Sequence, residues 1–269
     1  MGGKGWGHDD MSAPNLSFRS VTKRFSSPQV TALEEVDLEM AAGSVTAVIG
    51  VSGSGKSTLL RLAGGLDDVT KGQILIGGKA PEEVRHSKEV GWMSQHPALL
   101  PWRTAAENIK LAQTFNPQPG RAMASPGELL GLVGLADFAD AYPPALSGGM
   151  QQRVSLARTL AVRAPLWLMD EPFAALDELT RDSLAEEVIG LWAVDRPTVI
   201  WVTHHIGEAV KLADEIVVLT PSPGRVGSRF TIDLERPRDE TSAAFQMIVR
   251  RARAILHGNP AIKPVEAAG

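Results

Sequence analysis

Nine consecutive residues near the start of the chain have the types and the spacing of a phosphate-binding loop. They are Gly50, Val51, Ser52, Gly53, Ser54, Gly55, Lys56, Ser57 and Thr58. They satisfy the pattern GxxxxGK[ST] at every specified position. The glycines of such a loop let consecutive backbone N–H groups turn toward one anion, and the positive end of the following helix points at the same place. The segment therefore predicts a site for the phosphates of a nucleoside triphosphate.

Three side chains of this loop have separate expected roles. Lys56 reaches the β- and γ-phosphates, the Ser57 hydroxyl holds Mg²⁺, and Thr58 caps the helix or packs. The alternative is a glycine-rich strand-to-helix turn with an accidental lysine, which the apolar run 45–49 before the loop and the apolar helix after it disfavour. Kinases, GTPases, motor ATPases and transport ATPases share this loop, so it does not identify the activity.

Two adjacent carboxylates end a second apolar run. Asp170 and Glu171 follow the expected strand Leu166–Met169 and precede Pro172. Asp170 is expected to hold Mg²⁺ through its water shell, and Glu171 to orient or deprotonate the attacking water. The alternative is a solvated acidic turn, which the position of the pair behind a phosphate loop disfavours.

A third motif, LSGGMQQR, spans residues 146–153. Taken alone, this motif predicts a serine N-cap and two flexible glycines at the start of a helix. A hydroxyl and free N–H groups at a helix start also form an anion-binding surface. Two phosphate-binding surfaces in one chain suggest that they meet across a dimer.

The order of these motifs resembles the ABC ATPases, and the resemblance covers about residues 16–219. It implies ATP and Mg²⁺ as cofactors. It also implies that Ser147, Gly148 and Gly149 complete the ATP site of a partner subunit, either an identical copy or a paired ATPase.

The resemblance assigns four further side chains. Gln95 would sense Mg²⁺ and the γ-phosphate, and Phe25 would stack on adenine. Asp177 would belong to the D-loop, and His204 would contact the γ-phosphate as the switch histidine, which makes it catalytic with Glu171 and Lys56. Each has a structural alternative. Phe25 and His204 could belong to the core, Asp177 could be an N-cap, and Gln95 could be an ordinary polar loop residue.

Departures from the family pattern are Val51, Met150, Ala174 and His205, and none removes an expected phosphate, metal or water ligand. His205 follows His204 where Asp is usual. A second imidazole beside the switch histidine suggests a turnover that depends on pH near neutrality.

The segment LLPWRTAAENI at residues 99–109 resembles the corresponding segment in importers of nitrate, sulfonates, taurine and related solutes. Pro101 fixes a loop and Trp102 offers a large amphipathic ring for a partner helix, unless Trp102 packs on its own lobe. The implied partners are integral-membrane permease subunits and, indirectly, a solute-binding protein. Nitrate, an alkanesulfonate, taurine and a pyrimidine vitamin precursor stay open as the solute.

Alternating strands and helices must position these groups, which predicts a mostly parallel α/β sheet with helices on both faces. Together with the resemblance, this gives an ABC ATPase nucleotide-binding domain with a parallel P-loop core, an antiparallel β layer and an inserted α-helical subdomain. The expected bounds are a flexible leader at 1–13, the ATPase domain at 14–220 with its helical part at about 96–160, and a C-terminal β/helical extension at 221–269.

The expected elements are listed here by residue range. Strands are expected at 16–21, 36–40, 45–49, 74–76, 90–93, 166–169, 198–202, 216–219 and 229–234, and helices from Lys56 and at 104–113, 125–133, 149–162, 178–193, 206–212 and around Arg250, Arg251 and Arg253.

Composition limits the remaining classes. The 269 residues include no cysteine, 43% are hydrophobic and the net charge is −4, which gives no general attraction to nucleic acid. No apolar run is long enough to cross a bilayer and no signal-peptide core is evident, so we expect a peripheral protein on the cytoplasmic face of the membrane. A small-molecule kinase would leave the 146–153 motif unused. A non-transport ABC ATPase acting on nucleic acid or ribosomes is the main alternative, although the coiled coil or second ATPase domain typical of such proteins is lacking.

Overall fold

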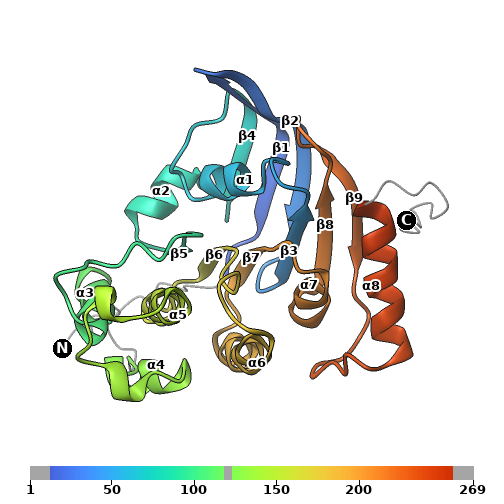
Figure 1. Ribbon diagram of the computed structural model, residues 1–269. Helices are drawn as coiled ribbons and strands as arrows, with labels where there is room; N and C mark the ends of the chain where they lie inside the picture. Colours follow the sequence, from blue (N-terminus) through green and yellow to red (C-terminus); the bar gives the residue numbers. More distant parts are fainter. Residues whose placement is uncertain (1–12, 118–122, 257–269) are drawn as a thin grey trace, which may run out of the picture.

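The computed structural model describes residues 13–117 and 123–256. The expected leader at 1–13 therefore lies almost wholly outside the described residues, as does the end of the expected C-terminal extension. Two β-sheets with helices around them form the described part (Figure 1).

The larger sheet has six strands in the order β5-β6-β7-β3-β8-β9. All neighbours are parallel except β8 and β9, which are antiparallel. The strands are β3 (Val45–Gly50), β5 (Val90–Met93), β6 (Leu166–Asp170), β7 (Thr198–Val202), β8 (Glu215–Leu219) and β9 (Val226–Thr231). The parallel strands thus begin and end close to where their apolar runs predict, and the predicted parallel core is confirmed.

Alternate side chains of the central strands pack into two separate hydrophobic cores. In β6, Trp167 and Met169 point to one face, and Leu166 and Leu168 point to the other. β3 and β7 divide their side chains in the same way. Since both faces are covered, these strands are apolar at nearly every position rather than at every second one.

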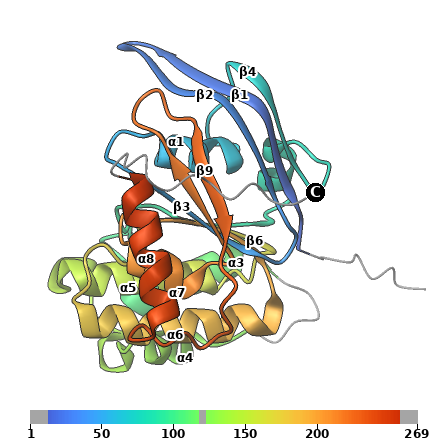
Figure 2. The same cartoon turned by 90° about the vertical axis from the view of Figure 1, so that its right-hand side faces the viewer.

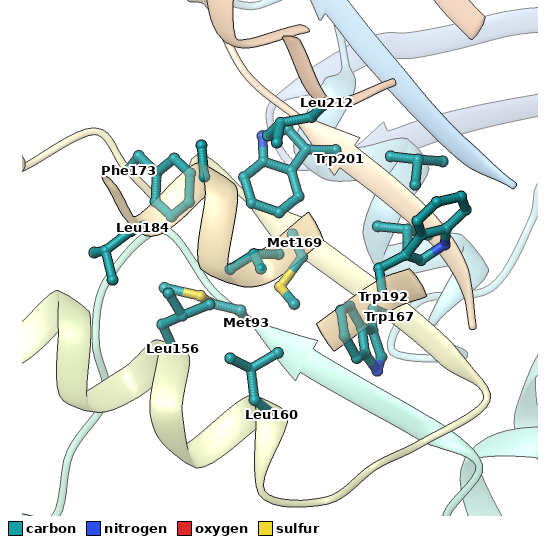
Figure 3. Close-up of a cluster of buried hydrophobic side chains, with 14 of the residues drawn as sticks. Met93, Leu156, Leu160, Trp167, Met169, Phe173, Leu184, Trp192, Trp201 and Leu212 are labelled. Carbon is teal, nitrogen blue, oxygen red and sulfur yellow. The ribbon is translucent and has the colours of Figure 1, made fainter. Parts of the chain in front are cut away.

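Helices cover the two faces of this sheet (Figures 1 and 2). α1 (Lys56–Ala63) lies between the two sheets, and its leucines pack with residues of both. α5 (Gly148–Leu160), α6 (Glu178–Asp195) and α7 (Ile206–Leu212) pack on the opposite face. Large aromatic and sulfur-containing side chains fill that second core (Figure 3).

The smaller sheet is antiparallel, in the order β2-β1-β4. Its strands are β1 (Leu16–Ser26), β2 (Gln29–Met40) and β4 (Lys71–Ile76), all longer than predicted. The register between β1 and β2 shifts after Phe18, where Ser20 has a φ of 49° and its N–H donates to the Asp37 carboxylate at 2.7 Å. This bulge breaks the apolar alternation that the sequence-based boundary relied on.

The segment between β5 and β6 is helical, with five short elements. They are α3 (Ala105–Phe115), α4 (Pro126–Leu132), the 3₁₀ turns η1 (Ala136–Phe138) and η2 (Pro143–Ala145), and α5. Thr104 and Ser125 each form a complete capping box with the glutamate three residues later, as the sequence predicts for Ser125. The short helix α2 (Pro81–His86) was not expected.

At the end of the described chain, β9 lies three residues earlier than predicted and is followed by α8 (Ala243–Leu256). The prediction followed the apolar residues Phe230, Ile232 and Leu234. Pairing with β8 sets the actual strand, because β8 starts at Glu215, which pairs with Thr231.

Candidate active site

Four of the parallel strands deliver predicted site residues to one edge of the sheet. β3 runs into the phosphate-binding loop, β5 is followed by Gln95, β6 by Glu171 and β7 by His204. The carboxyl ends of parallel strands share an edge, which is where open α/β sheets bind ligands. A cavity of about 610 Å³ lies there. It is lined by Val30, Ala32, Ser52, Gly53, Ser54, Gly55, Lys56, Ser57, Thr58, Gln95, Glu171, His204 and Ser222.

The loop backbone has a conformation that requires glycine at its last position. Gly55 has a φ of 89°, and a Cβ there would lie 2.7 Å from the carbonyl oxygen of Ala32 and from a methyl of Leu33. The loop can therefore enter α1 at Lys56 with its backbone packed directly on β2.

The Lys56 side chain is buried and folded back over the loop. Its Nζ donates to the carbonyl oxygens of Gly50 at 2.9 Å and Val51 at 3.1 Å. Burial lowers the pKa of Lys56, while the nearby carboxyls of Glu171 and Asp170 act in the opposite direction. The ammonium group is thus held at the cavity, with loop carbonyls as its partners.

Asp170 and Ser57 form an oxygen-rich pair at the base of the loop. Asp170 is buried, and burial raises the pKa of its carboxyl, while a hydrogen bond from Ser57 lowers it. The Oδ1 atom of Asp170 is buried without a hydrogen-bond partner. A buried carboxylate oxygen of this kind calls for a further partner, and a hard cation such as Mg²⁺ fits it.

No cluster of three or more histidine, cysteine or acidic side chains in residues 13–117 and 123–256 could hold a metal by itself. The protein oxygens that could join phosphates and water around a Mg²⁺ ion here are those of Asp170, Ser57 and Gln95. The residues present therefore fit the group.

Glu171 is held between the two other polar groups of the cavity. Its Oε2 atom accepts a hydrogen bond from Gln95 Nε2 at 3.2 Å and lies 3.4 Å from His204 Nδ1. Glu171 also has a φ of 48°, which is unusual outside glycine. Strained backbone of this kind is frequent at active sites. The three side chains that the sequence analysis assigned to different loops thus meet at one oxygen atom.

The remaining predicted nucleotide contacts lie outside the cavity lining. Phe25 is 37% exposed near the end of β1 and pairs with Val30, which lines the cavity. Lys23 Nζ lies 5.0 Å from the centre of the Phe25 ring. Phe25 is therefore not a core residue. Gly50 and Val51 precede the cavity-lining part of the loop.

Ser147, Gly148 and Gly149 form the start of α5 and are absent from the cavity lining. The Ser147 hydroxyl accepts the N–H of Met150 at 3.2 Å, so this residue is an N-cap. A Cβ on Gly149 would lie 2.9 Å from the Ala175 carbonyl oxygen, whereas one on Gly148 would meet nothing within 4 Å. Packing inside the chain explains Gly149 and leaves Gly148 without a structural reason.

Asp177 is likewise an N-cap. Its carboxylate accepts the backbone N–H of Thr180 at 2.9 Å and the Thr180 hydroxyl at 2.8 Å, and these bonds lower the pKa of Asp177. The side chain lies on the loop that contacts Gly149, between β6 and α6.

The sequence analysis missed Val30, Ala32 and Ser222 as cavity residues. The first two lie on β2, whose start was placed too late, and Val30 is the β2 partner of Phe25. No sequence pattern singles out Ser222, which reaches the cavity from the loop after β8.

His205 stacks beside His204, with ring centres 4.2 Å apart. Burial lowers the pKa of His205, and the positive charge of Arg181 acts in the same direction. Both effects shift this titration toward lower pH, and the pH response that the sequence suggested stays a prediction.

The loop after Gln95 is pinned at both ends. Arg158 donates to the carbonyl oxygens of Pro97 and Ala98, each at 2.8 Å. The buried Asn108 accepts the N–H of Leu100 at 2.8 Å and donates to backbone carbonyls of the same loop. Between these clamps Trp102 is 69% exposed, so it does not pack on its own helical lobe.

Comparison with known proteins gives consistent matches. A family model described as ABC transporter matches residues 33–174. An uncharacterized ABC transporter ATP-binding protein of Methanocaldococcus jannaschii is 43% identical over 239 residues, which cover 88% of this chain and 89% of that protein. The aliphatic sulfonates import ATP-binding protein SsuB 2 of Pseudomonas savastanoi pv. phaseolicola is 40% identical over 243 residues, covering 90% and 84%.

Among solved structures, the dimeric ATP-binding cassette MJ0796 in a post-hydrolysis state bound to ADP and Pi has a TM-score of 0.71. It is 30% identical and covers 82% of this chain and 100% of its own. In the part of the chain that the structure describes, none of the helices has the length and apolar character needed to cross a bilayer.

Proposed function

Since this chain belongs to the ABC transporter family as an ATP-binding subunit with ATPase activity, we propose that it powers the import of a small solute through separate membrane subunits. The observation that carries the proposal is the meeting of Lys56, Gln95, Glu171 and His204 around one cavity. The sulfonate import relatives favour the importer direction.

In this proposal Glu171 is the general base for hydrolysis. Its carboxylate lies at the cavity with Gln95 and His204 on one oxygen, which leaves the other oxygen to orient the attacking water. Lys56 would exchange its carbonyl partners for the β- and γ-phosphate oxygens, and His204 would bind the γ-phosphate. Phe25, beside Val30 at the cavity rim, is placed to stack on the adenine.

Ser57, Asp170 and Gln95 would hold Mg²⁺, with the unpartnered Asp170 oxygen as the strongest argument for the site. When bound, the ion offsets the negative charge that develops on the transferred phosphoryl group. Asp170 then keeps its charge, because a cation compensates for the burial that raises its pKa.

Two copies of the chain, or this chain and a second ATPase, would close around two ATP molecules. Each would contribute Ser147, Gly148 and Gly149 to the nucleotide bound by its partner, and Asp177 would lie at the contact. The support is that Gly148 has open space around it and that the solved relative MJ0796 is dimeric. ATP binding would drive closure, and hydrolysis would reopen the pair.

The pinned loop between Gln95 and Asn108 is the proposed contact with the membrane permease. It starts at a residue that touches Glu171 and presents the exposed Trp102. A membrane partner would place the subunit peripherally on the cytoplasmic face, with a solute-binding protein as an indirect partner. We also propose the bounds 14–220 for the ATPase unit, about 96–160 for its helical part and 221–269 for the extension.

The solute would be an alkanesulfonate, nitrate, taurine or a related compound. Alkanesulfonates lead because several relatives near 40% identity are named as aliphatic sulfonate import proteins. A non-transport ABC ATPase acting on nucleic acid or ribosomes is the competing function.

The test is purification of the chain from its natural host with whatever it binds, followed by reconstitution in vesicles with a solute-binding subunit. We expect membrane subunits to co-purify and an alkanesulfonate to stimulate ATP hydrolysis, with unrelated sugars as the control. Co-purification of ribosomes or nucleic acid without membrane subunits would favour the competing function.

A further inference from the structure

A buried carboxylic acid lies directly behind the switch-histidine segment. Glu208, in the first turn of α7, is 7% exposed. Its Oε1 atom accepts the indole N–H of Trp201, and its carboxylate also accepts a hydrogen bond from the Thr203 hydroxyl. Burial of a carboxylate is costly unless such donors face it, and here two adjacent parts of the β7 segment supply them.

These two donors connect Glu208 to the active site by separate routes. The Thr203 hydroxyl oxygen accepts the backbone N–H of His205 at 3.0 Å, next to the residue that contacts Glu171. The Trp201 ring meets Phe173 edge-on, with ring centres 5.0 Å apart (Figure 3). Phe173 follows Glu171 by two residues. One route from Glu208 thus reaches the segment that carries His204, and the other reaches the turn that carries Glu171.

Arg181 of α6 acts at the same place. Its guanidinium donates to the carbonyl oxygen of Leu176 at 2.9 Å, which fixes the loop before α6. Its positive charge also acts on Glu208. The oppositely charged residues Arg181 and Glu208 therefore border both the loop that carries Asp177 and the loop that carries His204.

We propose that Glu208 is a positioning residue for ATP hydrolysis, whose ionised carboxylate holds Thr203 and Trp201 and so keeps His204 against Glu171. The inference rests on the roles proposed above for Glu171 and His204. It assigns Glu208 no contact with ATP, since Glu208 does not line the cavity.

The carboxylate can change its charge under ordinary conditions. Burial raises the pKa of Glu208 to about 7, which outweighs the lowering by Trp201, Thr203 and Arg181; Glu171 raises it slightly further. The other charged groups on elements that pack against α7 are engaged elsewhere or exposed, and β3 contains no titratable residue. On α6, Asp182 pairs with Lys211, Asp195 pairs with Arg163, and Glu178, Glu186 and Glu187 are exposed. On α8 and the segment before it, Glu240 pairs with Lys211, Arg238 donates to α7 carbonyls, Arg251 lies on Phe230, and Arg250 and Arg253 are exposed.

Protonation would weaken this support. The neutral acid is a poorer acceptor for the Trp201 and Thr203 donors than the carboxylate is. Turnover should therefore fall as the pH drops through about 7. Glutamine has the same shape with one acceptor oxygen, so Glu208→Gln should resemble the neutral acid at every pH.

The first experiment measures kcat for ATP hydrolysis from pH 5.5 to 8.5 in the parent, Glu208→Gln and the exposed α6 variant Glu187→Gln. At pH 8 we expect kcat of Glu208→Gln to be lower by about tenfold, the effect of losing one charge-assisted hydrogen bond at a positioned group. Its pH response near 7 should also shrink, while Glu187→Gln follows the parent. A Glu208→Gln variant with the parent's profile overturns the proposal.

A second measurement separates titration from positioning. Because the folded pKa of Glu208 lies above its ordinary 4.5, folded protein binds this proton more tightly, and stability falls as the pH rises from about 4.5 to 7. Urea unfolding should show this fall in the parent and in Thr203→Val, and a smaller fall in Glu208→Gln.

Thr203→Val retains the acid but breaks its link to the His205 backbone. We expect its turnover response near pH 7 to shrink, because only the Trp201 route remains, although its unfolding still responds to pH. If Thr203→Val keeps the parent's turnover profile, Glu208 does not act through this segment. Normal turnover of Glu171→Gln would instead refute the assigned base, so the two failures are distinguishable.

Discussion

At the scale of single residues, the carboxylate of Glu171 is the group on which turnover should depend most. Gln95 and His204 both approach one of its oxygens, and its backbone is held in a left-handed conformation by the turn after β6. Glu171→Gln preserves the shape and the contact with Gln95 but removes the base. We expect kcat to fall by at least about 100-fold, with ATP affinity retained.

The measurement is phosphate release under saturating ATP, paired with calorimetric titration of ATP. Glu187→Gln, an exposed glutamate on α6, serves as the matched control and should hydrolyse ATP normally. Retained turnover in Glu171→Gln would exclude Glu171 as the base.

Asp170 offers a test of the metal site. Its unpartnered oxygen and its raised pKa both reflect a buried carboxyl group. In Asp170→Asn, affinity for ATP in the presence of Mg²⁺ should fall by about tenfold, as expected for loss of a charged ligand. Without Mg²⁺, affinity should stay equal or rise, because a negative charge near the phosphates is gone.

Calorimetry with and without a chelator distinguishes these outcomes. An equal loss of affinity in both conditions would indicate that Asp170 supports the loop fold and not the ion. Ser57→Ala, which removes the hydroxyl that bonds Asp170, should behave in the same direction.

At the scale of elements, the start of α5 combines two requirements. Ser147 caps the helix, so its replacement by alanine would lower the free energy of unfolding by about 1 kcal/mol. An effect on function could then not be separated from this loss of stability. Aspartate is an equally good N-cap but brings a negative charge. Ser147→Asp should therefore keep the melting temperature and lose ATP-dependent dimerisation, because the charge repels the partner's nucleotide phosphates.

The control is Ser125→Asp at the matching N-cap of α4, which should change neither property. Dimerisation is followed by light scattering of Glu171→Gln with ATP, in which the closed pair should accumulate. Dimers that form equally well with Ser147→Asp would remove the serine–glycine helix start from the nucleotide interface.

The elements also show which parts of the fold the sequence can predict. The capping residues of α4 and the buried strands β3, β6 and β7 were predictable because each signal is local: a serine with a glutamate three residues on, or an unbroken apolar run. The full lengths of β1 and β2 depend on a bulge, and the position of β9 depends on where β8 begins. The register of these strands is set by their pairing with neighbouring strands, which local sequence signals do not reveal.

The site follows the same division. Candidate residues that are identified by type and spacing, such as Lys56 and Glu171, could be proposed from the sequence, and both line one cavity in the structure. The clamps Asn108 and Arg158 could not be assigned, because their function depends on which carbonyl groups the folded loop turns toward them. Glu208 was missed for a related reason, since burial in the folded chain, which the sequence does not show, raises the pKa of this glutamate.

At the scale of the whole molecule, a cavity at one edge of the sheet is joined to a hydrogen-bonded loop that leads away from it. The loop begins at Gln95, which contacts Glu171, and is fixed again by Asn108 at the first turns of α3. A structure held at both ends can pass a displacement from one end to the other. Its exposed middle, with Trp102, contributes nothing to the interior of this chain.

Trp102→Ala should therefore separate ATP hydrolysis from transport. The isolated variant should unfold within about 0.5 kcal/mol of the parent, as is usual for exposed positions, and hydrolyse ATP at the parent's rate. Assembly with the membrane subunits should weaken by about 2 kcal/mol or more if the indole is a central anchor of that interface. Pull-down of the membrane subunits and solute-stimulated hydrolysis in vesicles measure the loss.

Phe115→Ala is the matched control, because this aromatic residue is also exposed, at 61%, but lies at the far end of α3 from the loop. It should leave assembly and stimulation intact. If both variants assemble normally, the permease contact lies elsewhere. If Trp102→Ala lowers the basal rate as well, the loop acts on Glu171 even without a partner, and the pinned segment belongs to the hydrolytic site itself.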